Sequence, residues 1–389
     1  MRTLVVLLLA IGSWACTPKP SPNDRLGNDL AALLDSALAA SPGLPGAMLR
    51  VEAPRLGLIW TKAAGVAEQG GEPLLPNHTF RIASMTKTFV AAAILRLVEQ
   101  GKLSLDAPIA RHILPASVAV LKRDGYDSER ITLRMLLQHT SGLFDFATAP
   151  PTATGNALAG GYADRILADP THRWTRAEQL ALAMEIGAPY GEPGAVYHYS
   201  DTGYILLGEI LETVTGGSMQ QAVRDLVGYQ RHGLANSYFE TLEDAPPTAG
   251  PRAHQYMDSL DTNGFDASVD LYGGGGLVSN LEDQARFFRA LVRGEVLEQR
   301  ATLDTMLTPS PQSQGERPGV GYGMGIGRGS VDQVVCYGHG GFWGTLARHC
   351  PELDITVVVA VTNNNARSAL GALTEGAIRL VAAAVGTRP

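Results

Sequence analysis

Apolar and polar residues follow short repeating patterns along this 389-residue chain, and the spacing of the apolar positions changes in an ordered way. Residues 47–51 and 58–61 are apolar and β-prone, and a turn containing Pro54 and Gly57 separates them, which predicts a β-hairpin. Residues 80–100 carry apolar side chains at helical spacing, which predicts a buried helix that ends at Gly101.

The middle of the chain has mostly helical spacing, interrupted by glycine and proline clusters. We predict helices over residues 131–138, 175–186, 202–214, 220–227 and 280–292. Alternating or β-branched segments return at residues 321–326, 331–337, 345–350 and 355–362, before an Ala-rich helix over 368–385. Strands at both ends with helices between them predict an α+β fold. In it both termini build one sheet, and residues from about 102 to about 315 form a mostly helical insertion.

Composition narrows the class of protein. The chain is 45% hydrophobic and 18% charged, as expected for a globular protein with a large core. Its net charge of −7 argues against binding to nucleic acid or to an anionic membrane surface through basic patches. The nine histidines show no metal-binding spacing, so we expect no metal and no cofactor. A small-molecule or peptide partner remains open, and so does the oligomeric state.

The first residues have the pattern of a targeting segment. Arg2 precedes an apolar run over residues 4–11, and small residues precede Cys16, which predicts a signal peptide over residues 1–15 and export. A cysteine directly after the cleavage site is typical of bacterial lipoproteins, so the mature protein is either anchored through lipid on Cys16 or freely exported. Residues 16–27 are predicted to form a Pro-rich tether, and residues 28–389 a single domain.

Export gives the other two cysteines a possible structural role. Cys336 and Cys350 lie at equal distances from Trp343, at the centre of a Gly-rich segment between two β-prone runs. A hairpin folded about Trp343 would place the cysteines opposite each other. A disulfide would then close a loop of about 15 residues and contribute roughly 3 kcal/mol of stability. The alternative is two reduced, buried cysteines.

The chemistry-bearing motif is Ser84-Met85-Thr86-Lys87. In a helix that starts near Ser84, residues three apart share a face, so the Lys87 ammonium reaches the Ser84 hydroxyl. A neighbouring lysine activates serine, which is otherwise a poor nucleophile. Tyr199 lies on a loop just before a predicted helix, and a phenol beside an ammonium loses its proton more readily, so Tyr199 could take the Ser84 proton.

These motifs, in this order, resemble the penicillin-recognising serine hydrolases, which include class C β-lactamases, D-Ala-D-Ala carboxypeptidases, D-aminopeptidases and family VIII carboxylesterases. The resemblance runs from about residue 28 to residue 386. Its matched segments lie at residues 80–88, 101–106, 136–143, 199–204 and 338–341. It implies an antiparallel sheet of both termini, flanked by helices, that packs against a mostly helical region with the site in the cleft between them.

The resemblance also implies roles for single residues. Ser84 would be the nucleophile, Lys87 its electrostatic partner or co-base, and Tyr199 the general base and then the general acid. His339 would stand where many relatives have lysine and would bind the carboxylate or leaving-group side of the substrate. The expected substrate-binding residues are Asp201, His339, Gly341 and Phe342.

The backbone N–H groups of Ser84 and Phe342 would bind the oxyanion, each contributing about 3 kcal/mol in the transition state. His139, in the segment 136–143, is expected to be a packing residue.

Asp201 departs from the pattern, because relatives commonly have asparagine there. A carboxylate only accepts hydrogen bonds, whereas an amide also donates one to a substrate carbonyl. We therefore expect Asp201 to hold Lys87 in its protonated form and to bind an acylamido carbonyl, such as that of penicillins, less well.

The sequence thus predicts an exported serine hydrolase that acts through a Ser84 acyl-enzyme on a D-amino-acid peptide, an ester or a β-lactam. The alternatives are a class C-type β-lactamase proper and a catalytically silent penicillin-recognising binding protein.

Overall fold

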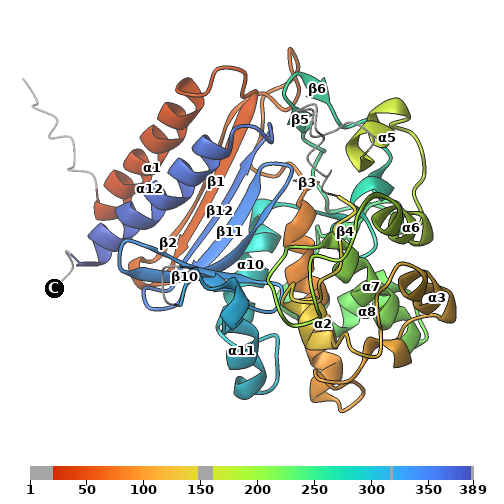
Figure 1. Ribbon diagram of the computed structural model, residues 1–389. Coiled ribbons are helices and arrows are strands. Elements are labelled where there is room, and N and C mark those ends of the chain that lie inside the picture. The colour runs from red at the N-terminus through yellow and green to blue at the C-terminus, as the bar shows by residue number, and fades with distance from the viewer. Residues whose placement is uncertain (1–20, 148–160, 316–318, 387–389) are drawn as a thin grey trace, which may run out of the picture.

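A seven-stranded antiparallel sheet lies between two groups of helices in this computed structural model, which describes residues 21–147, 161–315 and 319–386 (Figure 1). Its strand order is β2-β1-β12-β11-β10-β9-β8, so strands from the two ends of the chain pair directly, with Ala47 opposite Val361. The sequence prediction that both termini build one sheet is confirmed. The strands of this sheet are β1 (Gly46–Ala53), β2 (Leu58–Gly65), β8 (Gly321–Tyr322), β9 (Gly327–Val331), β10 (Val334–Gly341), β11 (Thr345–Cys350) and β12 (Ile355–Val361).

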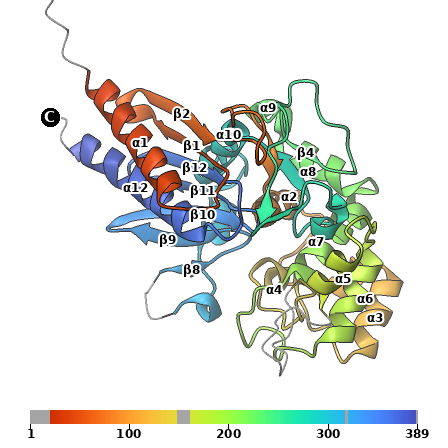
Figure 2. The same cartoon turned by 90° about the horizontal axis from the view of Figure 1, so that it is seen from above.

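Both faces of this sheet are covered. Every residue of β12 is buried, which explains why all of its residues except Ala360 are β-branched. Helices α1 (Pro22–Ala39) and α12 (Arg367–Gly386) pack side by side on one face, and α10 (Leu281–Val292) packs on the other (Figure 2). By length and composition α12 could cross a membrane, but its buried side chains are those of a core helix resting on the sheet. Helix α10 lies within the region predicted as the helical insertion, yet it packs directly on the sheet.

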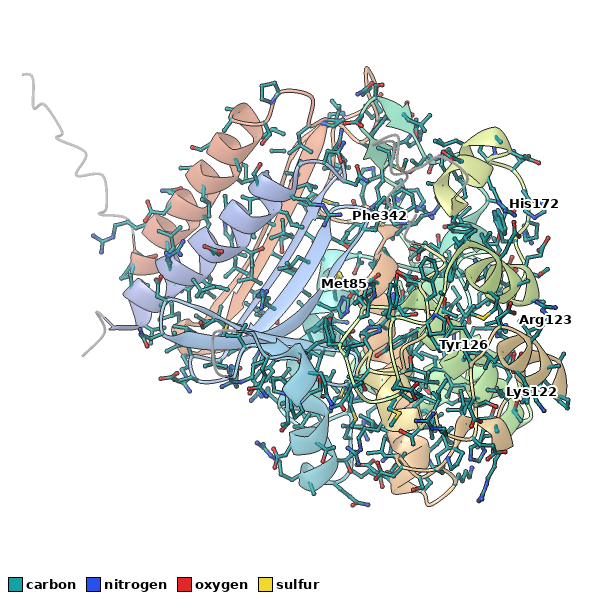
Figure 3. All side chains as sticks on the ribbon, viewed as in Figure 1. Met85, Lys122, Arg123, Tyr126, His172 and Phe342 are labelled. Atoms are coloured by element: carbon teal, nitrogen blue, oxygen red, sulfur yellow. A yellow bond between two sulfur atoms is a disulfide. The ribbon has the colours of Figure 1, made fainter. Side chains whose placement is uncertain are left out.

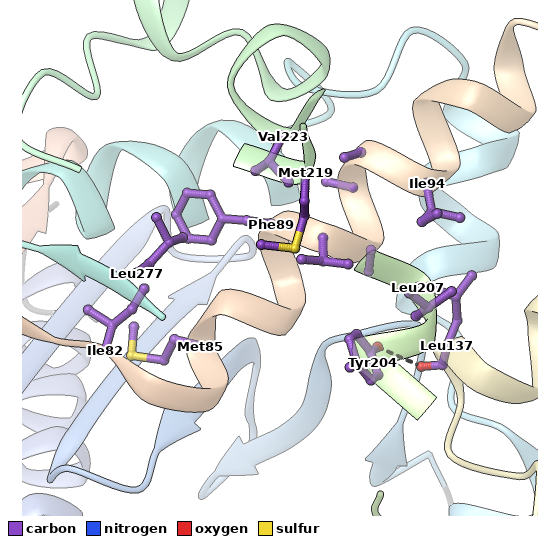
Figure 4. Packing of buried hydrophobic residues seen from close by; sticks show 14 of the residues in the cluster. Ile82, Met85, Phe89, Ile94, Leu137, Tyr204, Leu207, Met219, Val223 and Leu277 are labelled. Atoms are coloured by element: carbon purple, nitrogen blue, oxygen red, sulfur yellow. Dashed lines mark hydrogen bonds between the residues drawn. The ribbon is translucent and has the colours of Figure 1, made fainter. Parts of the chain in front are cut away.

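The second part of the structure is mostly helical, as the spacing predicted. Its core surrounds α2 (Thr86–Glu99), and Figure 4 shows Phe89 of this helix packed near Met219, Val223 and Leu277. Phe89 also stacks on Phe287, with ring centroids 3.5 Å apart. Three short strands, β3 (Phe80–Arg81), β4 (Tyr238–Phe239) and β7 (Leu277–Ser279), form a small sheet beside it, and β5 (Tyr256–Met257) pairs with β6 (Leu260–Asp261). The remaining helices are α3 (Pro115–Arg123), α4 (Leu133–Leu137), α5 (Tyr162–Ala168), α6 (Arg176–Ile186), α7 (Asp201–Thr215), α8 (Met219–Val227), α9 (Tyr229–His232) and α11 (Arg300–Leu307).

Several boundaries differ from the sequence predictions. The segment predicted as one strand over residues 331–337 contains the turn between β9 and β10, and only Gly321–Tyr322 of the segment 321–326 forms a strand. The helix predicted over residues 80–100 begins only at Thr86, because Phe80 pairs with Ser279 in β7 and Ala83 has a positive φ of 47°. The tether predicted over residues 16–27 ends earlier, because α1 begins at Pro22, where Ser21 and Asp24 form a reciprocal capping box. The predicted signal peptide and Cys16 lie outside the described residues.

The two cysteines form the predicted disulfide. Cys336 on β10 and Cys350 on β11 are bonded, and the hairpin register places Tyr337 opposite His349 and Gly341 opposite Thr345. This register is symmetric about Trp343, as the spacing predicted. The alternative of two reduced cysteines is wrong.

Candidate active site

Ser84 lies in a single 3₁₀ turn, Ala83–Met85, between β3 and α2. The positive φ of Ala83 is unfavourable for a residue with a side chain and marks a sharp change of direction just before Ser84. One turn later, Lys87 is completely buried, and its Nζ lies 3.0 Å from Ser84 Oγ. The predicted pairing of Ser84 with Lys87 is thus present in the structure.

The Lys87 ammonium has three acceptors. Its Nζ donates to Ser84 Oγ, to the carbonyl oxygen of Gly274 at 2.6 Å, and to Asp201 Oδ1 in an ion pair. An ammonium has three hydrogens and no lone pair, so all of them are engaged. In this state Lys87 cannot take the Ser84 proton unless it first gives up one of its own.

Tyr199 lies beside this pair, with Lys87 Nζ 5.0 Å from its ring centroid. Burial, and after it the charge of Asp201, raises the pKa of the Tyr199 phenol well above its usual value, although the Ser84 hydroxyl lowers it. Its hydroxyl makes no well-aligned hydrogen bond within the part of the chain that the structure describes. The sequence-based expectation that Lys87 makes this phenol lose its proton is therefore wrong: desolvation dominates, and Asp201 opposes the effect of the ammonium.

Two further carboxyl groups approach the site, and the sequence analysis missed both because no motif marks them. Asp145 accepts the backbone N–H of Asp201 at 3.0 Å, and Asp270 accepts Trp343 Nε1–H at 3.2 Å. Burial, reinforced by the charge of Asp201, raises the pKa of each carboxyl to about 7. Among the described residues, the carboxylates and histidines form no group arranged to hold a metal ion.

The end of β10 approaches the nucleophile closely. Gly341 and His339 share one face of β10, as the strand period requires. A Cβ added to Gly341 would lie 2.2 Å from the carbonyl oxygen of Ile82, two residues before Ser84. Phe342 follows directly and is 45% exposed; Figure 3 labels it together with Met85, the neighbour of Ser84. Glycine at position 341 thus allows the end of β10 to lie against the segment before Ser84. An oxyanion site formed by the N–H groups of Ser84 and Phe342 requires this close packing.

His339 is neutral in this arrangement. Its Nδ1 lies 2.6 Å from the carbonyl oxygen of Gly340, which can only accept, so Nδ1 carries the hydrogen and Nε2 accepts from Tyr322 Oη at 2.8 Å. Burial, and after it the charge of Lys87, lowers the pKa of His339 to about 3. His339 therefore offers no positive charge to a substrate carboxylate, and its expected role on the carboxylate or leaving-group side of the substrate stays a prediction. The sequence analysis also missed its partner Tyr322, which lies on the two-residue strand β8.

The comparisons with known proteins agree with this geometry. A family model described as "Beta-lactamase" matches residues 34–383. Penicillin-binding protein 4* of Bacillus subtilis is 24% identical over 300 residues, which cover 74% of this chain but 60% of that protein. Esterase EstB of Burkholderia gladioli is 28% identical over 346 residues, which cover 82% of this chain and 86% of the esterase. The structure of a D-stereospecific amidohydrolase from Streptomyces sp. matches with a TM-score of 0.72 and 28% identity, over 87% of this chain and 94% of that one.

Proposed function

This chain belongs to the beta-lactamase family, and from that premise we propose that it hydrolyses small amides or esters through an acyl-enzyme on Ser84. The observation that carries the proposal is the hydrogen bond between Lys87 Nζ and Ser84 Oγ, with the Tyr199 phenol buried beside both groups. Its relatives and structural neighbours include an esterase and an amidohydrolase, which are hydrolases of this fold.

Acylation needs an acceptor for the Ser84 proton, and the charges of the site favour Asp201. In our proposal Lys87 passes one proton to Asp201 Oδ1, and the amine so formed takes the proton of Ser84 as Oγ attacks the substrate carbonyl. Lys87 is then again an ammonium, Asp201 is a neutral acid, and the negative charge lies on the tetrahedral oxyanion. The N–H groups of Ser84 and Phe342 are the proposed donors to that oxyanion.

Tyr199 is the proposed proton donor to the leaving group, because its raised pKa keeps the phenol protonated at neutral pH. The resulting phenolate takes a proton from water, and the hydroxide attacks the acyl-enzyme. As Ser84 leaves, it regains a proton from Lys87, which regains one from Asp201. All groups then return to their starting states. Tyr199 acts here first as acid and then as base, the reverse of the order that the resemblance implies.

The charge of the site supports acyl groups that carry a protonated amine. Above about pH 7, three carboxylates and one ammonium lie together, which leaves a net charge of −2, and the Asp201 side chain is 15% exposed to solvent. At a distance of ~6 Å and an effective dielectric constant of ~20, each unit of charge contributes about 3 kcal/mol. Substrates with a carboxylate, such as β-lactams and carboxypeptidase peptides, are disfavoured by the same charge and by the neutral His339.

Two measurements test this proposal. A fluorophosphonate probe should add one mass increment to the wild-type protein and none to Ser84→Ala. No labelling of the wild type would instead favour the catalytically silent binding protein. Turnover of a D-amino-acid p-nitroanilide should then exceed that of its N-acetyl analogue, which lacks the positive charge of the free amine. Faster hydrolysis of nitrocefin than of either anilide would instead favour the β-lactamase alternative.

We further propose that the protein is exported and anchored through Cys16. The Cys336–Cys350 disulfide supports export, since disulfides persist in oxidising compartments. Expression of the full chain in a bacterial host, followed by fractionation, tests the anchor. Wild type should enter the membrane fraction and Cys16→Ser should leave it, whereas an equal distribution of both would contradict anchoring.

A further inference from the structure

We propose that His139 is a positioning residue, which holds the Tyr199 phenol in the place where it protonates the leaving group. This inference rests on the proposed function and deepens it. The sequence pattern indicated only a packing histidine. The structure shows contacts that converge on one catalytic side chain.

His139 holds the backbone on both sides of Tyr199. Its carbonyl oxygen accepts the N–H of His198 at 2.9 Å, and its Nδ1 accepts the N–H of Ser200 at 3.1 Å. Main chain and side chain of His139 can face the same loop because the residue has a positive φ of 57°. The backbone N–H groups of the residues before and after Tyr199 are thus tied to a single residue.

The imidazole also packs against the phenol itself. The ring centroids of His139 and Tyr199 are 4.1 Å apart, with an angle of 34° between the planes. Tyr204 and Tyr322 border the same imidazole at 5.0 and 4.8 Å, and the Tyr204 hydroxyl is tied to the carbonyl oxygen of Leu137 at the end of α4. Rotation of the Tyr199 ring away from Ser84 would have to displace this aromatic cluster.

The imidazole of His139 is neutral, as expected for a side chain that positions another residue without transferring protons. Because Nδ1 accepts the Ser200 N–H, the neutral ring carries its hydrogen on Nε2. Burial, and after it the Lys87 ammonium, holds the pKa of His139 well below its usual value. The Nε2 atom is buried and has no hydrogen-bond partner among the described residues. His139 therefore supports Tyr199 without itself titrating or exchanging protons with it.

The test compares two substrates whose leaving groups differ in whether they need a proton. An amide must have its leaving nitrogen protonated, whereas p-nitrophenolate leaves without a proton, so in the acylation step only the amide depends on a well-placed Tyr199 phenol. We expect His139→Ala to lower the single-turnover rate of acylation about 100-fold with a D-amino-acid amide and less than ~10-fold with the p-nitrophenyl ester, whose acylation is followed as the burst of p-nitrophenolate. His139→Asn keeps an acceptor for the Ser200 N–H and should recover part of the amide activity, which also guards against a variant that fails to fold.

His349 offers a matched control, because it is also fully buried, has Nδ1 bonded to Thr356 Oγ1 at 2.9 Å, and lies away from the site on β11. His349→Ala should destabilise the protein without changing the ratio of amide to ester acylation rates. Equal losses on both substrates in His139→Ala would overturn the positioning role. If Tyr199→Phe itself shows no preference for the ester, the proposed role of Tyr199 fails, and that result is distinct from a failure of His139 alone.

Discussion

Replacing Gly341 with alanine tests whether the end of β10 forms the oxyanion site. The added Cβ would lie 2.2 Å from the carbonyl oxygen of Ile82 and 2.2 Å from Thr345 Oγ1. Ordinary carbon–oxygen contacts begin near 3.4 Å, so β10 and the segment before Ser84 must separate by about 1 Å. The Ile82 oxygen belongs to the backbone and cannot rotate away. The substitution therefore moves the Phe342 N–H relative to Ser84.

The expected loss follows from this displacement. A misplacement of ~1 Å in an active site costs about 100-fold in rate, close to the effect of removing one oxyanion donor. The loss should appear in kcat, because the oxyanion contact forms only in the transition state. We would measure kcat and KM on a p-nitrophenyl ester, whose leaving group needs no acid, together with Tm.

Gly340→Ala is the matched control. A Cβ at position 340 meets nothing closer than 3.6 Å, so this variant should keep most of the activity and stability. If Gly341→Ala loses no more activity than Gly340→Ala, the Phe342 N–H does not bind the oxyanion, and the reasoning from this close approach is refuted.

Three further predictions follow from the same structure. Asp201→Asn should raise nitrocefin turnover relative to a short-chain ester and reduce the preference for a free amine over its N-acetyl analogue, and unchanged ratios would mean that this side chain does not face the substrate. Cys336→Ser with Cys350→Ser should lower the unfolding free energy by about 3 kcal/mol in denaturant titrations, and an unaltered midpoint would contradict a stabilising bridge. Burial raises the pKa of Asp145 from 3.8 to about 7, so the native state retains a proton that the unfolded state loses, and stability should fall as pH rises between these values, by at most about 4 kcal/mol. Asp270 has a similarly raised pKa and contributes to the same slope, so Asp145→Asn should make this part of the stability profile less steep without abolishing its slope, and an identical slope in both proteins would show that Asp145 does not contribute.

The local features of this protein could be predicted from sequence because they depend on residues close together in the chain. The three-residue spacing of Ser84 and Lys87 is sufficient to bring a hydroxyl and an ammonium together. The symmetric placement of Cys336 and Cys350 about Trp343 is sufficient to set the hairpin register. The β-branched run in β12 likewise indicates a strand buried on both faces.

Other features were decided only by tertiary contacts. The segment before Ser84 has helical spacing, yet Phe80 forms a strand because it pairs with Ser279. These two residues lie about 200 positions apart in the chain, so local spacing does not reveal the pairing. The sequence shows the phenol of Tyr199 and the ammonium of Lys87 but not the burial of the phenol, which reverses its expected protonation state.

The charge of the site was also set by the fold. Asp145 and Asp270 come from separate segments without a motif, and both interact electrostatically with Asp201 and Lys87 only once the chain is folded. His339 is neutral because the fold buries it and places the Lys87 ammonium nearby. Burial and charge act through space, so they depend on which side chains the fold brings together, and the order of residues along the chain does not show this.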